Sequence, residues 1–169
     1  MLFSRFVAEI EKHNLLKPND TVVAAVSGGA DSVCLLHLLC RLRTVWDLNI
    51  VCAHVNHKLR KEAYREAEFV STLCEKWGVP FRLHEEDVGE KARCEKISTE
   101  LAGRNARYAF FKTIPANTVM TAHNKNDVCE TVLLHMARGC GLDGLCGILP
   151  KREDGISSPL LSFSRTEIE

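Results

Sequence analysis

Hydrophobic residues in this chain form short unbroken runs that alternate with longer stretches in which apolar positions recur every three or four residues. The short runs predict β-strands at 21–26, 49–55, 80–87 and 118–122. The longer stretches predict helices at 31–43, 61–78, 98–114 and 126–139. The residues 1–13 place Phe3, Phe6, Val7 and Ile10 on one helical face, which predicts a packed amphipathic helix before the first strand.

Residues that favour helix ends support these boundaries. Gly78, followed by Pro80, ends the second predicted helix, and Ser98 is a suitable N-cap for the third. Pro115 ends that third helix, and Gly139 ends the fourth. The glycine-rich segment 139–150 predicts an ordered loop with short turns.

Alternating strands and helices predict an α/β fold, a Rossmann-like doubly wound parallel sheet in three α/β/α layers. The length of 169 residues suits a single domain. Ligands of such sheets bind beyond the carboxyl ends of the strands. Candidate functional residues are therefore sought at 27–32, 54–60, 85–89 and 122–127.

Composition narrows the function classes. Hydrophobic residues make up 46% of the chain, enough for a sizeable core, and the 22 Lys and Arg residues balance the 22 Asp and Glu residues. This balance argues against a nucleic-acid footprint over the whole surface but allows a local patch. Lys58, Arg60, Lys61 and Arg65 are the best candidates for one, with an exposed helix start as the alternative. No apolar run is long enough to span a bilayer and no signal peptide is recognisable, which predicts a cytoplasmic protein without a membrane partner.

The eight cysteines are scattered, and none forms a C-x-x-C pair. Cys34 and Cys40, like Cys140 and Cys146, have five residues between them, which is poor spacing for zinc ligands. We therefore expect reduced thiols that act as small hydrophobic residues.

The turn "SGGADS" between the first strand and the first long helix carries the clearest chemistry. Glycines 28 and 29 permit positive φ angles and a close approach of the backbone to a ligand, and the following helix N-terminus favours a phosphate group. Asp31 would repel that phosphate unless a metal bridges them, which indicates Mg²⁺ with a polyphosphate. The alternative is a tight turn in which Ser27 or Asp31 caps the helix. The predicted nucleotide contacts in this turn are Ser27, Gly28, Gly29, Ala30, Asp31 and Ser32.

This turn resembles the SGGxDS loop of the N-type ATP pyrophosphatases, also called the PP-loop family, whose fold is that of the adenine nucleotide alpha hydrolases. Three further stretches resemble the catalytic domain of the tRNA(Ile)-lysidine synthetases, and with the loop the resemblance runs from about Val22 to the end of the chain. They are "AHVNHKLR" at 53–60, "LAGRNARYAFF" at 101–111 and "TAHNKNDVCETVLLHMARGCGLDGL" at 121–145.

The resemblance implies that residues 1–169 form one PP-loop catalytic domain that lacks the C-terminal tRNA-binding regions of that family. It implies ATP and Mg²⁺ as cofactors, and tRNA(Ile) with a CAU anticodon and free L-lysine as partners. ATP would adenylate the C2 oxygen of the wobble cytidine, and the ε-amine of lysine would then displace AMP. A homodimer is one assembly that the sequence leaves open.

The resemblance also implies roles for single residues. Arg104 and Arg107 lie three apart on one helix face and would neutralise phosphate charge, with a solvated face as the alternative. His123 would contact the α-phosphate or the cytidine, with a hydrogen-bonded structural role as the alternative. Ala53 and His54 would lie near the nucleotide.

The lysine substrate would be held by Asp127 and Glu130, and Arg138 would belong to a glycine-rich loop over the site. Asp-x-x-Glu at a helix start is also a capping box, so a purely structural role for this pair stays open. The implied catalytic set is Asp31, Arg104, Arg107, His123 and Asp127, with Asp31 as the metal ligand.

Two positions depart from the family pattern. Asn126 stands where many members have a first Asp, which puts a second metal ligand in doubt, and Ser158 stands where arginine is usual. Three other functions remain open: a tRNA thiolation enzyme with the same loop, an ATP-dependent ligase of a small molecule, and a nucleotide-binding regulatory module without catalysis.

Overall fold

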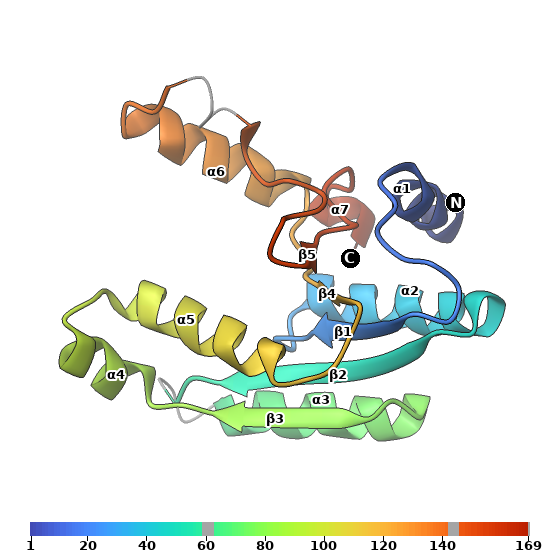
Figure 1. Ribbon diagram of the computed structural model, residues 1–169, viewed down its shortest axis with the longest axis horizontal. Coiled ribbons are helices and arrows are strands. Elements are labelled where there is room, and N and C mark those ends of the chain that lie inside the picture. The colour runs from blue at the N-terminus through green and yellow to red at the C-terminus, as the bar shows by residue number, and fades with distance from the viewer. Residues whose placement is uncertain (59–62, 142–145, 169) are drawn as a thin grey trace.

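The computed structural model describes residues 1–58, 63–141 and 146–168 (Figure 1). Its strands form one parallel sheet with the order β3-β2-β1-β4-β5. The strands are β1 (Thr21–Ala25), β2 (Asn49–Asn56), β3 (Phe81–Glu85), β4 (Thr118–Met120) and β5 (Ile156–Ser157). The helices are α1 (Leu2–Lys12), α2 (Ala30–Trp46), α3 (Ala63–Trp77), α4 (Val88–Glu95), α5 (Thr99–Lys112), α6 (Lys125–Ala137) and α7 (Arg165–Ile168).

The sheet confirms the predicted α/β class. Strand β1 is central: Val22 is in register with Ile50 of β2 on one side and with Thr118 of β4 on the other. The chain first builds outward from β1 to β2 and β3, and then crosses to β4 on the far side of β1. The strand order thus reverses at the β1/β4 boundary, which is where open α/β sheets bind ligands.

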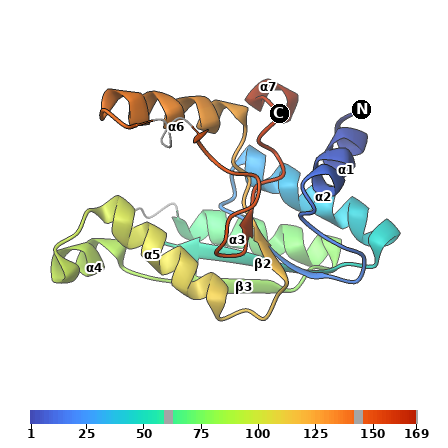
Figure 2. The same cartoon turned by 45° about the horizontal axis from the view of Figure 1, so that its top comes forward.

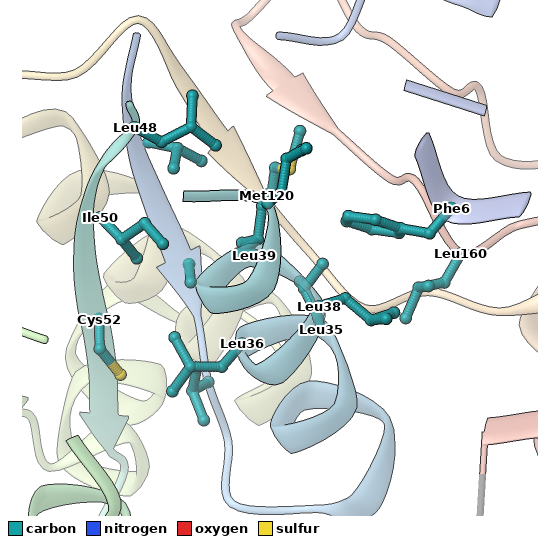
Figure 3. Close-up of a cluster of buried hydrophobic side chains, with 14 of the residues drawn as sticks. Phe6, Leu35, Leu36, Leu38, Leu39, Leu48, Ile50, Cys52, Met120 and Leu160 are labelled. Carbon is teal, nitrogen blue, oxygen red and sulfur yellow. The ribbon is translucent and has the colours of Figure 1, made fainter. Parts of the chain in front are cut away.

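One face of the sheet is covered by α1, α2 and α3, together with the C-terminal segment that contains α7 (Figures 1 and 2). The leucines of α2 provide the centre of this core. Figure 3 shows Leu36 and Leu39 near Ile50 and Met120 of the sheet, while Leu35 and Leu38 lie toward Phe6 and Leu160. The core therefore fixes α2, and with it the turn that opens α2, against β1.

The opposite face is covered by α5, with α4 beside it. Phe111 of α5 packs on Val23 and Ala53. Helix α6 extends away from the sheet, and none of its residues is buried (Figure 1). Only the N-terminal end of α6 adjoins the carboxyl ends of the strands, so that end is the part of the helix relevant to the site.

The structure contains two elements that the sequence did not predict, α4 and β5. The strand expected over 80–87 ends at Glu85, since Asp87 is the N-cap of α4 and its Oδ1 accepts from the Glu90 N–H at 2.8 Å. Ser98 is confirmed as the N-cap of α5, where its hydroxyl accepts from the Leu101 N–H at 3.1 Å. No helix in the described ranges has the length and hydropathy needed to cross a membrane.

Candidate functional site

The turn between β1 and α2 is held by the hydroxyl of Ser32. Its Oγ accepts from the N–H groups of Ser27 and Gly28, both at 3.2 Å, and donates to the Gly29 carbonyl at 2.8 Å. Gly28 has a φ of +96°, and Gly29 is the N-cap of α2 in an extended conformation. The turn is thus shaped before any ligand arrives.

Gly28 also faces α3. A Cβ added at Gly28 would lie 3.5 Å from Val70 Cγ2 and 3.7 Å from Glu66 Cβ. The positive φ favours glycine at this position, and the space around it is open enough for a Cβ. Because the Ser27 and Gly28 amides are bonded within the turn, the amides free for a phosphate are those of the first turn of α2, beginning at Ala30. The direct ligand contact expected from Gly28 stays a prediction.

Asp31 lies in that first turn, with a side chain that is 27% exposed. Its Oδ1 is buried and has no hydrogen-bond partner among the described residues, while its Oδ2 lies 4.0 Å from Arg165 Nε. A buried acceptor without a partner carries a desolvation cost that a bound cation would remove. Within the described ranges no three His, Cys, Asp or Glu side chains gather as a metal site. The buried Oδ1 of Asp31 could hold a Mg²⁺ ion whose other ligands are waters or phosphate oxygens, the usual arrangement for this ion, and this role stays a prediction.

The N-terminus of α6 is closed by a capping box. The Asn124 side chain accepts from the N–H groups of Asn126 at 2.8 Å and Asp127 at 3.2 Å, and Asp127 Oδ2 accepts from the Asn124 N–H at 2.9 Å. The sequence left open a capping box with Asp127 as the N-cap and Glu130 as its partner. This was wrong by three residues, because the N-cap is Asn124 and its partner is Asp127. Glu130 is exposed and takes no part in it. The second oxygen of Asp127, Oδ1, lies 3.8 Å from Arg165 Nη2.

His123 follows β4 and is partly buried. Its Nδ1 lies 2.9 Å from Thr121 Oγ1, which in turn lies 2.9 Å from Ser158 Oγ. Burial lowers the pKa of His123 below its ordinary 6.5, against a smaller opposing effect of Asp127. The imidazole is therefore neutral at pH 7. Ser158 stands where the resembling family usually has arginine. Its Oγ lies 2.9 Å from Thr121 Oγ1 and 3.5 Å from His123 Nδ1.

Three arginines lie close enough to His123 for their charges to act on it. Arg104 and Arg107 of α5, with Arg152, lower the pKa of His123 further through their positive charges. Arg107 also acts on His57, whose pKa is lowered mainly by burial. The structure thus brings the two arginines of α5 to the edge of the sheet where β4 ends, near His123.

His54 and Ala53 lie at the end of β2 beside the turn. His54 is 2% exposed, and its Nδ1 lies 2.7 Å from the Val26 carbonyl. The Ala53 carbonyl accepts from the Val26 N–H at 2.9 Å. These contacts fix the end of β1, so both residues position the turn, whereas their contact with a nucleotide stays a prediction.

Residues 3–169 match the family model described as a PP-loop domain. The chain belongs to the PP-loop family. The family implies the use of ATP, in agreement with the nucleotide expected at the SGGADS turn.

Curated relatives extend over almost the whole PP-loop domain. A tRNA(Ile)-lysidine synthase of Clostridium acetobutylicum is 44% identical over 165 residues, covering 95% of this chain and 36% of the relative. That of Thermosipho africanus is 44% identical over 172 residues, covering 99% of this chain and 40% of the relative. The chain therefore spans well under half the length of the relatives it matches.

Solved structures support the fold alone. The U34-tRNA thiolase NcsA from Methanococcus maripaludis has a TM-score of 0.78 at 18% identity, covering 99% of this chain and 62% of that chain. The NH3-dependent NAD synthetase of Campylobacter jejuni has a TM-score of 0.60 at 16% identity, covering 98% and 67%. Both confirm the α/β architecture with a parallel sheet that the sequence predicts.

Not every predicted site residue of the PP-loop domain lies near the others. Arg138 is the C-cap of α6, eleven residues beyond Asp127 and so roughly 16 Å along the helix. Gly147 packs back on α6, since a Cβ there would lie 3.3 Å from Val128 Cγ1. Gly144 of the expected covering loop, like Arg60 and Lys61 of the expected basic patch, lies outside the described residues.

Two residues of the site were missed. Arg165 lies within 4.0 Å of both Asp31 and Asp127, and no sequence pattern singled it out. Asn124 was readable as an N-cap because it stands three residues before Asp127. A cavity of about 370 Å³ beside Tyr108, Asn117 and Asp154 lies at the opposite end of β4, and no predicted site residue lines it.

Proposed function

We propose that this PP-loop domain is the catalytic part of a ligase that joins free L-lysine to C2 of the wobble cytidine in a CAU-anticodon tRNA(Ile), at the expense of ATP. The observation that supports this most strongly is the 44% identity, over 95% or more of the chain, to relatives named tRNA(Ile)-lysidine synthase. The proposal places the protein in the cytoplasm and leaves a homodimer as an open prediction.

In the first step, the C2 oxygen of cytosine attacks the α-phosphorus of ATP, and pyrophosphate leaves with the electrons of the broken P–O bond. The free amides of the first turn of α2 would stabilise the charge on the phosphates, assisted by Arg104 and Arg107. Mg²⁺ held by Asp31 would supply further positive charge to the phosphate oxygens.

In the second step, the ε-amine of lysine attacks C2 and AMP leaves. The ammonium of free lysine must first lose a proton. Asp127 and the exposed Glu130 are one helical turn apart, so they can face the same ammonium. His123, kept neutral by burial, is able to accept its proton.

The chain has equal numbers of acidic and basic residues. We therefore do not expect these 169 residues alone to bind a whole tRNA by nonspecific electrostatic attraction to its phosphates. Under the proposal, the remaining length that the relatives possess supplies most of the tRNA contact, and this domain supplies the chemistry.

The test is to incubate the full-length protein with ATP, Mg²⁺, radiolabelled lysine and tRNA(Ile), and to measure label in the RNA. Label should require the C of the CAU anticodon and should be lost in Asp31→Asn. Absence of label with the wild-type protein would contradict the proposal. Thiolation is distinguished by the double variant Cys140→Ser and Cys146→Ser, which should retain lysine incorporation, whereas a thiolase that depends on this pair should lose its activity.

A further inference from the structure

Arg165 links the two parts of the site that come from different segments of the chain. Its Nε lies 4.0 Å from Asp31 Oδ2 on α2, and its Nη2 lies 3.8 Å from Asp127 Oδ1 on α6. Its backbone N–H also donates to Asn126 Oδ1 at 3.2 Å. One guanidinium therefore bridges the carboxylates at the N-termini of two helices.

Two carboxylates drawn to one cation would repel each other without it. The guanidinium compensates their charge, and it occupies the space between the metal-binding candidate Asp31 and the lysine-binding candidate Asp127. A divalent cation at Asp31 would be repelled by a guanidinium that remained 4.0 Å from Oδ2. The buried and unpartnered Oδ1 of the same carboxylate indicates that the guanidinium satisfies Asp31 only in part.

The docking of α7 does not depend on this bridge. Phe163 is fully buried, Ile168 is 9% exposed, and Glu167 forms an ion pair with Arg5 of α1. Glu167 also accepts from the Ser164 N–H at 2.9 Å, which caps the short helix. Arg165 itself has a side chain that is 48% exposed, so it has the freedom to turn away from Asp31.

We propose that Arg165 is a positioning residue whose guanidinium acts as a stand-in cation, holding Asp31 and Asp127 together in the unliganded protein and releasing Asp31 when a divalent cation binds there. The inference rests on the proposed use of Mg²⁺ and ATP at this site. It makes Arg165 a competitor of the metal, so that replacing it with a neutral side chain strengthens metal binding.

The test uses Mn²⁺ alone as the probe, without nucleotide, lysine or tRNA, on the full-length protein. Free Mn²⁺ is measured by electron paramagnetic resonance during titration of the wild type, Arg165→Met, Arg165→Lys and the matched control Arg5→Met. Removal of one positive charge about 4 Å from the metal ligand should lower the Kd of Arg165→Met roughly threefold to tenfold. Arg165→Lys should stay near the wild-type value.

Arg5→Met also removes one positive charge, but Arg5 pairs with Glu167 rather than with Asp31, and Phe163 and Ile168 keep α7 docked, so its Kd should not change. Adding Asp31→Asn to Arg165→Met should abolish the gain. The inference is overturned if Arg165→Met binds Mn²⁺ no more tightly than the wild type, or if Arg5→Met gains as much. Lysine incorporation by the wild-type protein is a separate readout, so failure of the proposed function and failure of this inference are distinguishable.

Discussion

Gly28→Ala is predicted to destabilise the fold through the backbone alone. The φ of +96° at this position costs an L-amino acid about 1–2 kcal/mol. The added Cβ would lie 3.5 Å from Val70 Cγ2, an ordinary van der Waals distance, so no steric clash is added. For a chain of this length each kcal/mol lowers the melting temperature by about 2–4 °C. We therefore expect a decrease of roughly 2–8 °C.

Gly29→Ala is the matched control in the same turn. Gly29 has a φ of −74°, and a Cβ there would meet only Ser27 Oγ at 3.7 Å. Alanine is a poorer N-cap than glycine, but it also reduces the entropy of the unfolded chain, and these effects offset each other. Calorimetry should find its melting temperature within about 2 °C of the wild type. Equal losses in both variants, or no loss in Gly28→Ala, would refute the argument from φ.

Three further predictions concern charged groups of the site. Asp31→Asn should abolish ATP- and tRNA-dependent release of AMP while circular dichroism remains unchanged. Asp127→Ala should lower the melting temperature by about 2–4 °C through loss of the capping box. Glu130→Gln should leave the melting temperature unchanged and raise the KM for lysine roughly tenfold, but not the KM for ATP. If Glu130→Gln lowers only the stability, the assignment of capping to Asp127 and lysine binding to Glu130 is wrong. Because burial holds the pKa values of His57 and His123 below 6.5, the unfolded state binds more protons as the pH falls below 6.5, so stability should be retained above that pH and lost below it. Urea unfolding between pH 7.5 and 5.5 should show a smaller loss in His123→Gln, and an unchanged slope would count against the buried histidine.

The elements with strong hydrophobic patterns were predictable from the sequence, and those formed by tertiary contacts were not. Helix α4 has the sequence VGEKARCE, in which only Val88 and Ala92 are buried, so its apolar period is too short to recognise. Strand β5 consists of Ile156 and Ser157 and exists through pairing with β4. A strand of two residues is too short to show an alternating hydrophobic pattern in the sequence.

The site residues divide in the same way, into those predictable from local sequence and those brought in by tertiary packing. The position of the SGGADS turn was predictable because its signal is local, and the structure places it between β1 and α2, whereas its contacts with a nucleotide stay a prediction. Arg165 was not predictable, because its meeting with Asp31 follows from the packing of Phe163 and Ile168 far along the chain. Arg138 lies at the far end of the thirteen-residue helix α6 from Asp127, so it does not adjoin that carboxylate, and its contact with a substrate stays a prediction.

The balanced charge of the chain is consistent with binding a polyanion, because the positive potential of this site arises locally. The N-termini of α2 and α6 meet near enough for one guanidinium to reach a carboxylate in the first turn of each. Each terminus contributes the positive end of a helix dipole, and α2 adds the unpaired amides of its first turn, neither of which enters a count of charged side chains. Asp31 and Asp127 compensate this potential before a ligand binds, and Arg104 and Arg107 add to it from α5. A net charge of zero is therefore compatible with a triphosphate site at the β1/β4 boundary, because the positive potential there comes from the backbone dipoles of the two helices.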